Sequence, residues 1–418
     1  MSDNPFISDT FINVWTRHFN NGNAPLSFDG LKGVKLVKNV GKPIMINTGK
    51  NLTKGLGYTV DTKKLAALGS GVILIQDVMS NSGVYKTGNT SKIGLKKIPQ
   101  YPGFLINMDN VESLDSFMKS KFKKSSRYKF KKYRKRLESS FNISYEILKG
   151  SISKEYHDLV FDDFKTLLER RFHQKKEYNN NLDPEEWRFY KEVAYPMIQE
   201  EKAALFIIRN DNELVAANLL FLDNQRIIDA IRVFDIDFAK FRLGTVSIMA
   251  LIEWALENGY TSIDFSKGHY DYKERWSTQT YTFEYHVLYN PKSMVSRAIA
   301  SYISSKLHLK TFLRKKGLNV LFHKIRYRIK ERNSGTIKDK GSYQLVDELV
   351  NHPESEWQEV ALNNLKPKVK SLVFDFLYLT MEKSSLTKLY QALGPMPVFK
   401  INGEKHVKYI VVSNENLN

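Results

Sequence analysis

The stretch from Arg226 to Trp276 constrains the fold most, because strand-like and helix-like patterns alternate within it. Residues 227–234 form a short run with β-branched side chains, as in a strand. Apolar residues then recur every three to four positions from Val246 to Ala255, which predicts a helix that ends at Asn258-Gly259. Residues 261–265 alternate apolar with polar side chains and predict a second strand. Such a strand-helix-strand unit favours parallel pairing with a right-handed crossover.

Composition narrows the class of protein. With 418 residues the chain is long for one core, which favours two domains or a duplicated unit. Its 42% hydrophobic content argues for a globular protein and against a disordered one. The formal net charge of +19 favours an anionic partner such as a phosphate-rich cofactor, a membrane surface or nucleic acid.

Two absences in the sequence exclude further classes. The chain has no cysteine, so disulfides, thiolate zinc sites and cysteine nucleophiles are excluded. The opening residues 1–15 lack a basic start with an apolar core, and no window holds about 18 uncharged apolar residues. We therefore expect a cytoplasmic protein without a membrane span, with peripheral contact at the inner membrane face left open.

The pattern of the first part of the chain predicts a small lobe. Residues 1–100 combine an amphipathic helix near Phe11–Phe19 with short apolar runs separated by glycines. Residues 111–140 are helical in pattern and very basic, with no acidic residue from Lys119 to Arg136.

The middle part predicts helices followed by an antiparallel meander. A strand at 142–148 precedes a helix at 154–171. Asp183-Pro184 opens the next helix, because aspartate suits the cap and proline suits the first turn. Two strands at 203–209 and 214–222 then join the strand at 227–234.

The last part is basic and then mixed. Residues 298–330 predict a basic amphipathic helix interrupted at Gly317, and 331–341 a polar linker. In the final module we expect a strand at 372–379, a helix at 386–393 and a hairpin through Asn402-Gly403.

This order of elements, with FRLGT leading into a helix and IDFSKGHYDYKERW after the next strand, resembles the GNAT acyltransferases. More narrowly it resembles the BioF2-like or CelD/BcsL acetyltransferase branch, which is related to the FemABX peptidyltransferases. The positions of the branch motif are occupied here by Asp264-Phe265, Gly268, Tyr272-Lys273 and Trp276. The chain departs from it at Tyr270, where the branch usually has an acid, and in a phosphate loop shortened to residues 242–245.

The resemblance implies an α/β (α+β) fold, with a GNAT-type mixed sheet flanked by helices and duplicated as in FemABX. A small C-terminal α/β module follows. The expected divisions are a GNAT-like lobe with the basic helix at 1–150, the acyltransferase domain at 151–297, the basic helix and linker at 298–340, and the module at 341–418.

The resemblance also implies a binding site for acetyl-CoA or another acyl-CoA as co-substrate. The start of the predicted helix can take the pyrophosphate through free N–H groups, and the end of the preceding strand can polarise the thioester carbonyl. The residues expected there are Val233, Phe234, Arg242, Leu243, Gly244 and Thr245. A plain strand-to-helix turn is the alternative interpretation of this loop, and no metal site is expected.

Acyl transfer needs a base for the acceptor and an acid for the leaving thiolate. The candidates are His269, Asp271, Tyr272 and Lys273, of which Tyr272 and Lys273 match the branch motif. A solvated loop histidine, and a structural pair of Lys273 with Asp264, are the competing interpretations. Glu169, Arg170 and Arg171 match a family position that faces the acceptor, although a solvated helix end explains them equally well.

Three functions follow as hypotheses. The first is an acyl-CoA-dependent N- or O-acyltransferase of the N-acetyltransferase type, acting directly on an envelope-related sugar, lipid or amine. The second is a FemABX-like transferase that uses aminoacyl-tRNA. The third is a non-catalytic module that binds a membrane or nucleic acid through its basic helices, with nucleic acid less favoured because no reader motif accompanies the charge.

Overall fold

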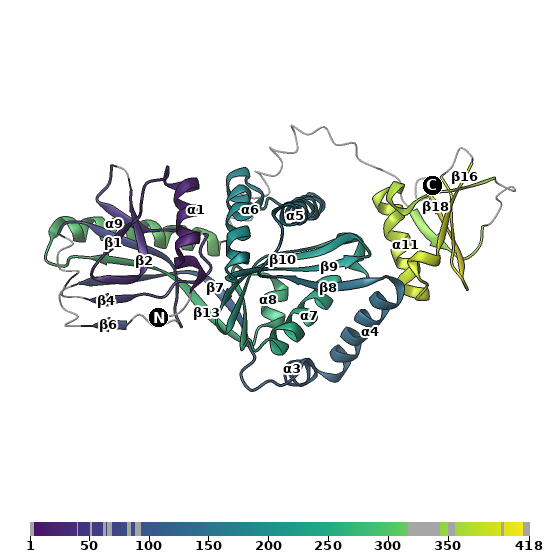
Figure 1. Ribbon diagram of the computed structural model, residues 1–418, viewed down its shortest axis with the longest axis horizontal. Coiled ribbons are helices and arrows are strands. Elements are labelled where there is room, and N and C mark those ends of the chain that lie inside the picture. Colours follow the sequence, from purple (N-terminus) through teal and green to yellow (C-terminus); the bar gives the residue numbers. More distant parts are fainter. Residues whose placement is uncertain are drawn as a thin grey trace.

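The computed structural model describes residues 4–39, 41–50, 52–61, 64, 69–81, 85–87, 93–316, 343–349, 356–393 and 397–412. In these ranges the strands form one sheet of 13 strands and one of five. The large sheet spans the left and centre of Figure 1, and the small sheet belongs to the C-terminal module on the right.

The first half of the large sheet follows a short capped helix. In α1 (Asp9–Phe19) the Ser8 side chain accepts a hydrogen bond from the Phe11 N–H, which satisfies a free donor of the first turn. The strands of this half are β1 (Leu26–Phe28), β2 (Leu31–Lys38), β3 (Ile44–Asn47), β4 (Thr59–Asp61), β5 (Val72–Met79), β6 (Tyr85–Thr87) and β7 (Gly94–Asn107). The predicted opening helix and strand-rich lobe are confirmed.

The second half contributes most of the helices. Its elements are α3 (Leu114–Lys121), α4 (Lys124–Ser140), β8 (Ile143–Leu148), α5 (Lys154–Lys175), α6 (Pro184–Gln199), β9 (Ala203–Asn210), β10 (Glu213–Asp223), β11 (Arg226–Phe234), α7 (Leu243–Glu257), β12 (Ser262–Lys267), α8 (Asp271–Trp276), β13 (Gln279–Tyr289) and α9 (Met294–Lys315). The meander β9–β10–β11 and the parallel pairing of β11 with β12 are as predicted. Of the elements between β7 and α5, β8 pairs with β9, and α4 packs on α7.

The large sheet repeats one arrangement on both sides of its centre. β3 and β5 pair in parallel in the first half, and β11 and β12 do so in the second. At the centre, β13 of the second half pairs with β5, and β7 of the first half pairs with β12. β7 and β13 also pair with each other. Each parallel pair is thus extended by a strand of the other half, and the predicted duplicated mixed sheet is confirmed.

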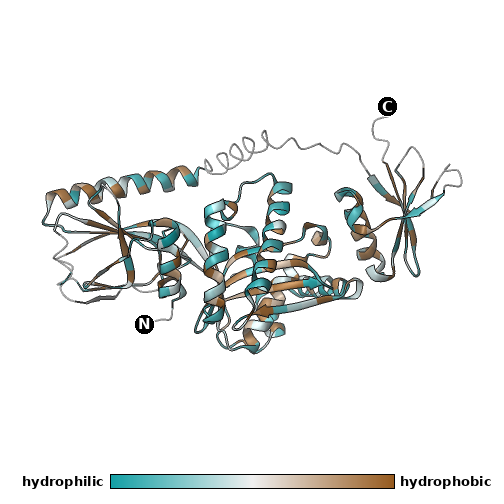
Figure 2. Cartoon of the chain, turned by 45° about the horizontal axis from the view of Figure 1, so that its top comes forward, coloured by the Kyte–Doolittle hydropathy of each residue, from teal (hydrophilic) through white to brown (hydrophobic). Residues whose placement is uncertain are grey.

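Helices cover both faces of the second half. α5 and α6 lie on one face, and α3, α4 and α7 on the other (Figure 1). Along β10 the side chains alternate between the two cores: Leu219 and Phe221 pack toward α5 and α6, and Leu220 and Leu222 toward α7. Figure 2 shows apolar residues gathered along the strands of the large sheet. No helix in the described ranges combines the length and apolarity needed to cross a membrane.

The repeat extends to the backbone irregularities of the inner strands. β5 and β12 each contain a register shift, at Asp77 (φ 60°) and Ser266 (φ 58°), which both adopt the left-handed conformation. After these shifts the halves are joined by an ion pair, with Lys267 Nζ 2.6 Å from Asp77 Oδ1. Thr53 and Gln100 also donate hydrogen bonds to this buried carboxylate, at 2.7 and 2.8 Å. The ion pair therefore fixes the two halves at their junction.

The C-terminal module corrects two predictions. Residues 372–379 lie within α11 (Pro367–Thr380), whose buried face repeats at helical spacing, and not in a strand. The helix predicted at 386–393 is wrong, because residues 388–392 form β16 (Lys388–Ala392), which pairs with β15 (Trp357–Glu359) and β17 (Phe399–Asn402). Short apolar runs fit either structure, so the contacts of each segment with the rest of the module decided both cases. The hairpin at 402–403 is confirmed between β17 and β18 (Val407–Val412), and β18 also pairs with β14 (Tyr343–Val346).

The basic helix predicted at 298–330 begins earlier, at Met294, and its described part ends at Lys315. The rest of that helix, the Gly317 break and the linker to 341 lie outside the described residues. α9 packs on β7 and β13, where Thr311 Oγ1 donates a hydrogen bond to the carbonyl of Pro99.

We predict that Lys267→Met lowers the free energy of unfolding by about 3 kcal/mol, because it leaves the buried Asp77 carboxylate without its cation. The double variant Asp77→Asn/Lys267→Met removes both charges and should recover part of the loss. Urea denaturation measures both variants. Equal stability of the single and double variants would contradict the role given to this ion pair.

Candidate active site

The parallel strands β11 and β12 separate along their length. They pair only from Arg226 to Ile228 on β11 and from Ser262 to Asp264 on β12, although β11 continues to Phe234 and β12 to Lys267. A register shift between β10 and β11 lies beside the point of separation, at Leu219 and Leu220. The later part of β11 therefore has backbone groups on its β12 side that β12 does not bind.

The N-terminus of α7 follows the free end of β11. Arg242 precedes the helix in the left-handed conformation (φ 56°) and is exposed, and no side chain in the described residues caps this end. Thr245 N–H donates to the carbonyl of Arg242, which closes the first turn. The exposed start of an uncapped helix carries partial positive charge and can bind an anion.

Gly244 lies in close contact with the Phe234 ring. A Cβ at Gly244 would lie 2.5 Å from Phe234 Cε1, a distance that real side chains do not adopt. The Arg171 guanidinium lies 3.9 Å from the centre of the same ring. Gly244 thus has a packing role, in addition to the phosphate contact predicted for it.

The other expected cofactor-binding residues differ in exposure. The side chains of Val233 and Leu243 are buried in the two cores, so only their backbone groups can face a ligand. Phe234 and Thr245 are partly exposed.

A buried ion pair lies on β11 near the separation of the strands. Arg232 Nη2 is 2.7 Å from Asp229 Oδ2, and Asn218 also donates to this carboxylate. The Arg232 guanidinium lies 5.9 Å from the centre of the Tyr272 ring. Its Nη1 atom is buried and has no hydrogen-bond partner within the described part of the chain. This donor is available to a ligand carbonyl or oxyanion, and sequence reasoning missed it.

Tyr272 and Lys273 of α8 lie against this ion pair. Lys273 is only 6% exposed, and its Nζ donates a 3.0 Å hydrogen bond to the carbonyl of Lys267. Burial lowers the pKa of Lys273 to about 8, and the Asp229 charge partly offsets the shift. Burial raises the pKa of Tyr272 far above its usual value, and Asp229 adds to the shift. At neutral pH Tyr272 is a proton donor, and Lys273 is close to its titration range.

The other two catalytic candidates lie apart from this cluster. His269 has a side chain that is 66% exposed, with Nε2 3.9 Å from Glu274 Oε2. Asp271 begins α8 and is exposed. The structure thus brings together Tyr272 and Lys273, but not His269 and Asp271.

Several neighbouring residues have structural partners. Asp264 is fully buried and accepts hydrogen bonds from the Tyr281 hydroxyl and the Ser266 N–H. Arg170 binds Asp235 at 3.0 Å and Asp237 at 2.9 Å, whereas Glu169 is exposed. Arg171 is the member of the predicted 169–171 group that faces the site, because it stacks on Phe234.

The family comparison matches the region just described. Residues 124–274 match the model of the acetyltransferase (GNAT) domain. The chain carries a GNAT domain. The matched segment extends from α4 to α8 and includes β11, α7, β12 and every predicted site residue.

Several solved structures are similar to this chain at low identity. FemX is 12% identical with a TM-score of 0.44, covering 67% of this chain and 91% of its own. A conserved protein of unknown function from Bacteroides thetaiotaomicron is 13% identical with a TM-score of 0.41, covering 69% and 92%. L-PGS from Bacillus licheniformis is 11% identical with a TM-score of 0.39, covering 65% and 85%. No curated protein matched the chain.

Across the described residues, no group of three or more His, Asp or Glu side chains could hold a metal ion.

We predict that Gly244→Ala lowers the free energy of unfolding by about 1–3 kcal/mol, because the added Cβ displaces the Phe234 ring. Phe234→Leu in the same chain should relieve the clash and recover part of the loss. Urea denaturation of the two variants checks this. A Gly244→Ala protein as stable as the parent would contradict the packing role.

Proposed function

We propose that this GNAT protein transfers an acyl group from a CoA thioester directly to an amine or hydroxyl acceptor. The observation that carries the proposal is the separation of β11 from β12 beside the uncapped start of α7. Such a gap offers backbone hydrogen bonds to an extended ligand, and the helix start offers N–H groups to its phosphates.

In this proposal the pantetheine arm lies along the free side of β11, between Ile228 and Phe234. The pyrophosphate lies at the first turn of α7, where Gly244 and Thr245 are partly exposed and Arg242 supplies charge. The ring of Phe234 moves from its position over Gly244 when the donor binds.

The transfer needs one proton acceptor and one proton donor. Neutral Lys273 removes a proton from the acceptor as its nitrogen or oxygen attacks the thioester carbon. Arg232 Nη1 and the free N–H groups of β11 stabilise the negative charge on the carbonyl oxygen. The C–S bond then breaks, and Tyr272 gives its proton to the leaving thiolate. His269 and Asp271 remain candidates for contact with the acceptor at the exposed edge.

The acceptor is proposed to be an envelope-related sugar, lipid or amine. A second donor, aminoacyl-tRNA, is favoured by one observation: the Phe234 ring and Arg171 occupy the approach to Gly244. A thermal-shift series separates the two donors. A rise in melting temperature with CoA or acetyl-CoA supports the first, because a ligand of the folded state stabilises it. No rise with either, together with acyl transfer from aminoacyl-tRNA, supports the second.

We predict that Lys273→Met reduces kcat/KM for acyl-CoA turnover by roughly 10²–10⁴-fold, the usual contribution of a general base. In the parent protein kcat/KM should rise with pH and level off above about pH 8, because only neutral Lys273 accepts the proton. CoA release with an amine panel measures both effects.

The matched control is Arg275→Met, which removes an exposed cation from the same short helix and should change kcat/KM little. Unchanged turnover in Lys273→Met would contradict the role of Lys273. Failure of all variants and the parent to turn over any donor would favour the non-catalytic module.

A further inference from the structure

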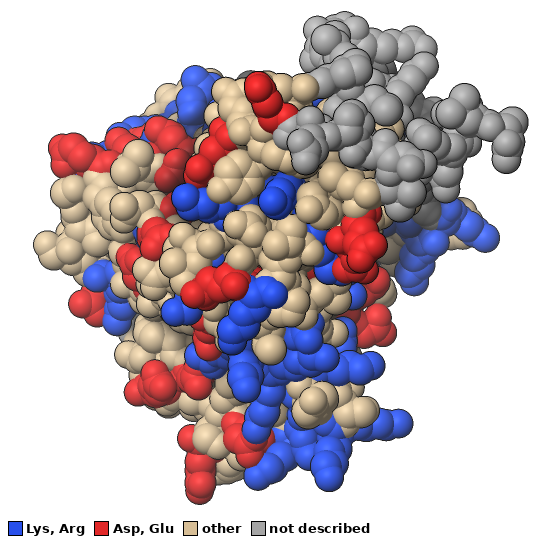
Figure 3. All heavy atoms as spheres, turned by 90° about the vertical axis from the view of Figure 1, so that its right-hand side faces the viewer, with Lys and Arg blue, Asp and Glu red and all other residues tan. Residues whose placement is uncertain are grey.

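The surface of α3 and α4 carries a concentration of positive charge. Residues 119–136 contain eleven Lys and Arg and no Asp or Glu. Among them Lys124, Lys129 and Lys132 are exposed on α4. Figure 3 shows Lys and Arg gathered on the lower part of this side of the molecule. Such a surface attracts a polyanion over distances of about a Debye length.

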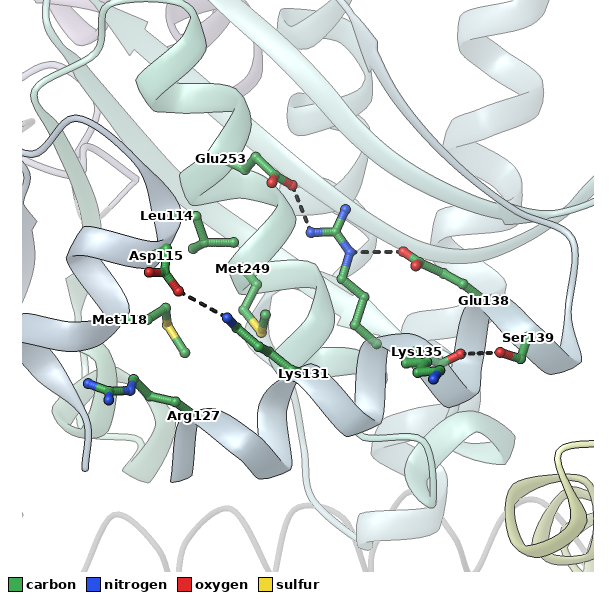
Figure 4. A pocket seen from close by; sticks show the side chains of 11 residues that line it. Leu114, Asp115, Met118, Arg127, Lys131, Lys135, Glu138, Ser139, Met249 and Glu253 are labelled. Atoms are coloured by element: carbon green, nitrogen blue, oxygen red, sulfur yellow. Dashed lines mark hydrogen bonds and ion pairs between the residues drawn. The ribbon is translucent and has the colours of Figure 1, made fainter. Parts of the chain in front are cut away.

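A pocket of about 490 Å³ opens between α3, α4 and α7 beside this surface. Its apolar lining comes from Leu114 and Met118 of α3 and Met249 of α7 (Figure 4). The volume is that of a site for a small organic ligand. The pocket contains none of the predicted catalytic or cofactor-binding residues.

The carboxylates at the pocket are paired with cations. Asp115 is 2.7 Å from Lys119 and 3.0 Å from Lys131, and Arg134 binds both Glu138 and Glu253. Arg127 and Lys135 also line the pocket, and neither has an ion pair with a described residue. The rim therefore has an excess of positive charge above an apolar interior.

We propose that this pocket and the α4 surface bind an anionic phospholipid at a membrane surface. The phosphate group lies at the rim with Arg127 and Lys135, and the start of an acyl chain contacts the two methionines and Leu114. Methionine side chains adapt well to flexible apolar ligands. Nucleic-acid bases are bound mainly by stacking on aromatic rings, and no aromatic residue of the described chain lines the pocket.

The inner sides of α3 and α4, with the turn between them, connect this surface to the candidate active site. Trp276, three residues after Lys273, packs on Phe122 and Phe130 at ring distances of 4.9 and 5.6 Å. Lys121 also donates a hydrogen bond to the carbonyl of Ser277. Lipid bound here would hold α8 close to the membrane surface. The binding itself does not depend on the proposed reaction.

The test is cosedimentation of the full chain with phosphatidylcholine vesicles, with and without phosphatidylglycerol. We expect binding only to the anionic vesicles. Arg127→Glu/Lys135→Glu should weaken that binding roughly tenfold or more, since each Lys or Arg at an anionic surface contributes substantially. Leu114→Trp, which fills the pocket without changing charge, should also weaken it.

The control is Lys32→Glu/Lys38→Glu, which makes the same charge change at exposed positions of β2. Equal weakening by the control would overturn the proposal, because it would show a general charge effect. Equal binding to both kinds of vesicle, or no binding, would also overturn it. Binding of tRNA through Arg127 and Lys135 that anionic vesicles cannot displace would overturn the proposal as well.

Discussion

β7 of the first half pairs with β12 of the second, and β13 of the second half pairs with β5 of the first. This exchange of β7 and β13 is the constraint on which the rest of the structure depends. Because the strand next to each parallel pair comes from the other half, neither half can complete its sheet alone. The exchange brings the irregular ends of β5 and β12 together, where the Asp77–Lys267 ion pair closes the junction. The loop after β12 then has a fixed start, and Lys273 is held by the Lys267 carbonyl.

The candidate site follows from an interruption of regular pairing. A fully paired β11 and β12 would leave no backbone groups for a ligand, whereas their separation after Ile228 and Asp264 leaves the last part of β11 free on one side. Burial sets the chemistry of the groups around that gap. Lys273 is buried, and Tyr272 and Arg232 are partly buried. Burial brings the pKa of Lys273 to about 8 and keeps Tyr272 protonated.

Local patterns predicted the elements of the site well. Residues 226–265 form the strand-helix-strand unit that their periodicity indicates, and Asn258-Gly259 ends the helix as expected from their backbone preferences. The separation of the strands, the exchange of β7 with β13 and the position of Arg232 depend on contacts between distant segments, so a local pattern does not contain them. The same reason explains the wrong assignments of residues 372–379 and 386–393, where tertiary contacts decided between helix and strand. Gly244 shows a further limit: the sequence predicted only a role in cofactor binding, and the structure identifies the Phe234 ring as its neighbour.

We propose that β11 and β12 separate to hold an acyl donor. A crystal structure of the protein with CoA tests it most directly. We expect pantetheine density between the strands beyond Ile228 and Asp264, with the pyrophosphate within hydrogen-bond distance of the first N–H groups of α7. CoA bound only outside this gap, with the Phe234 ring still packed on Gly244, would contradict it.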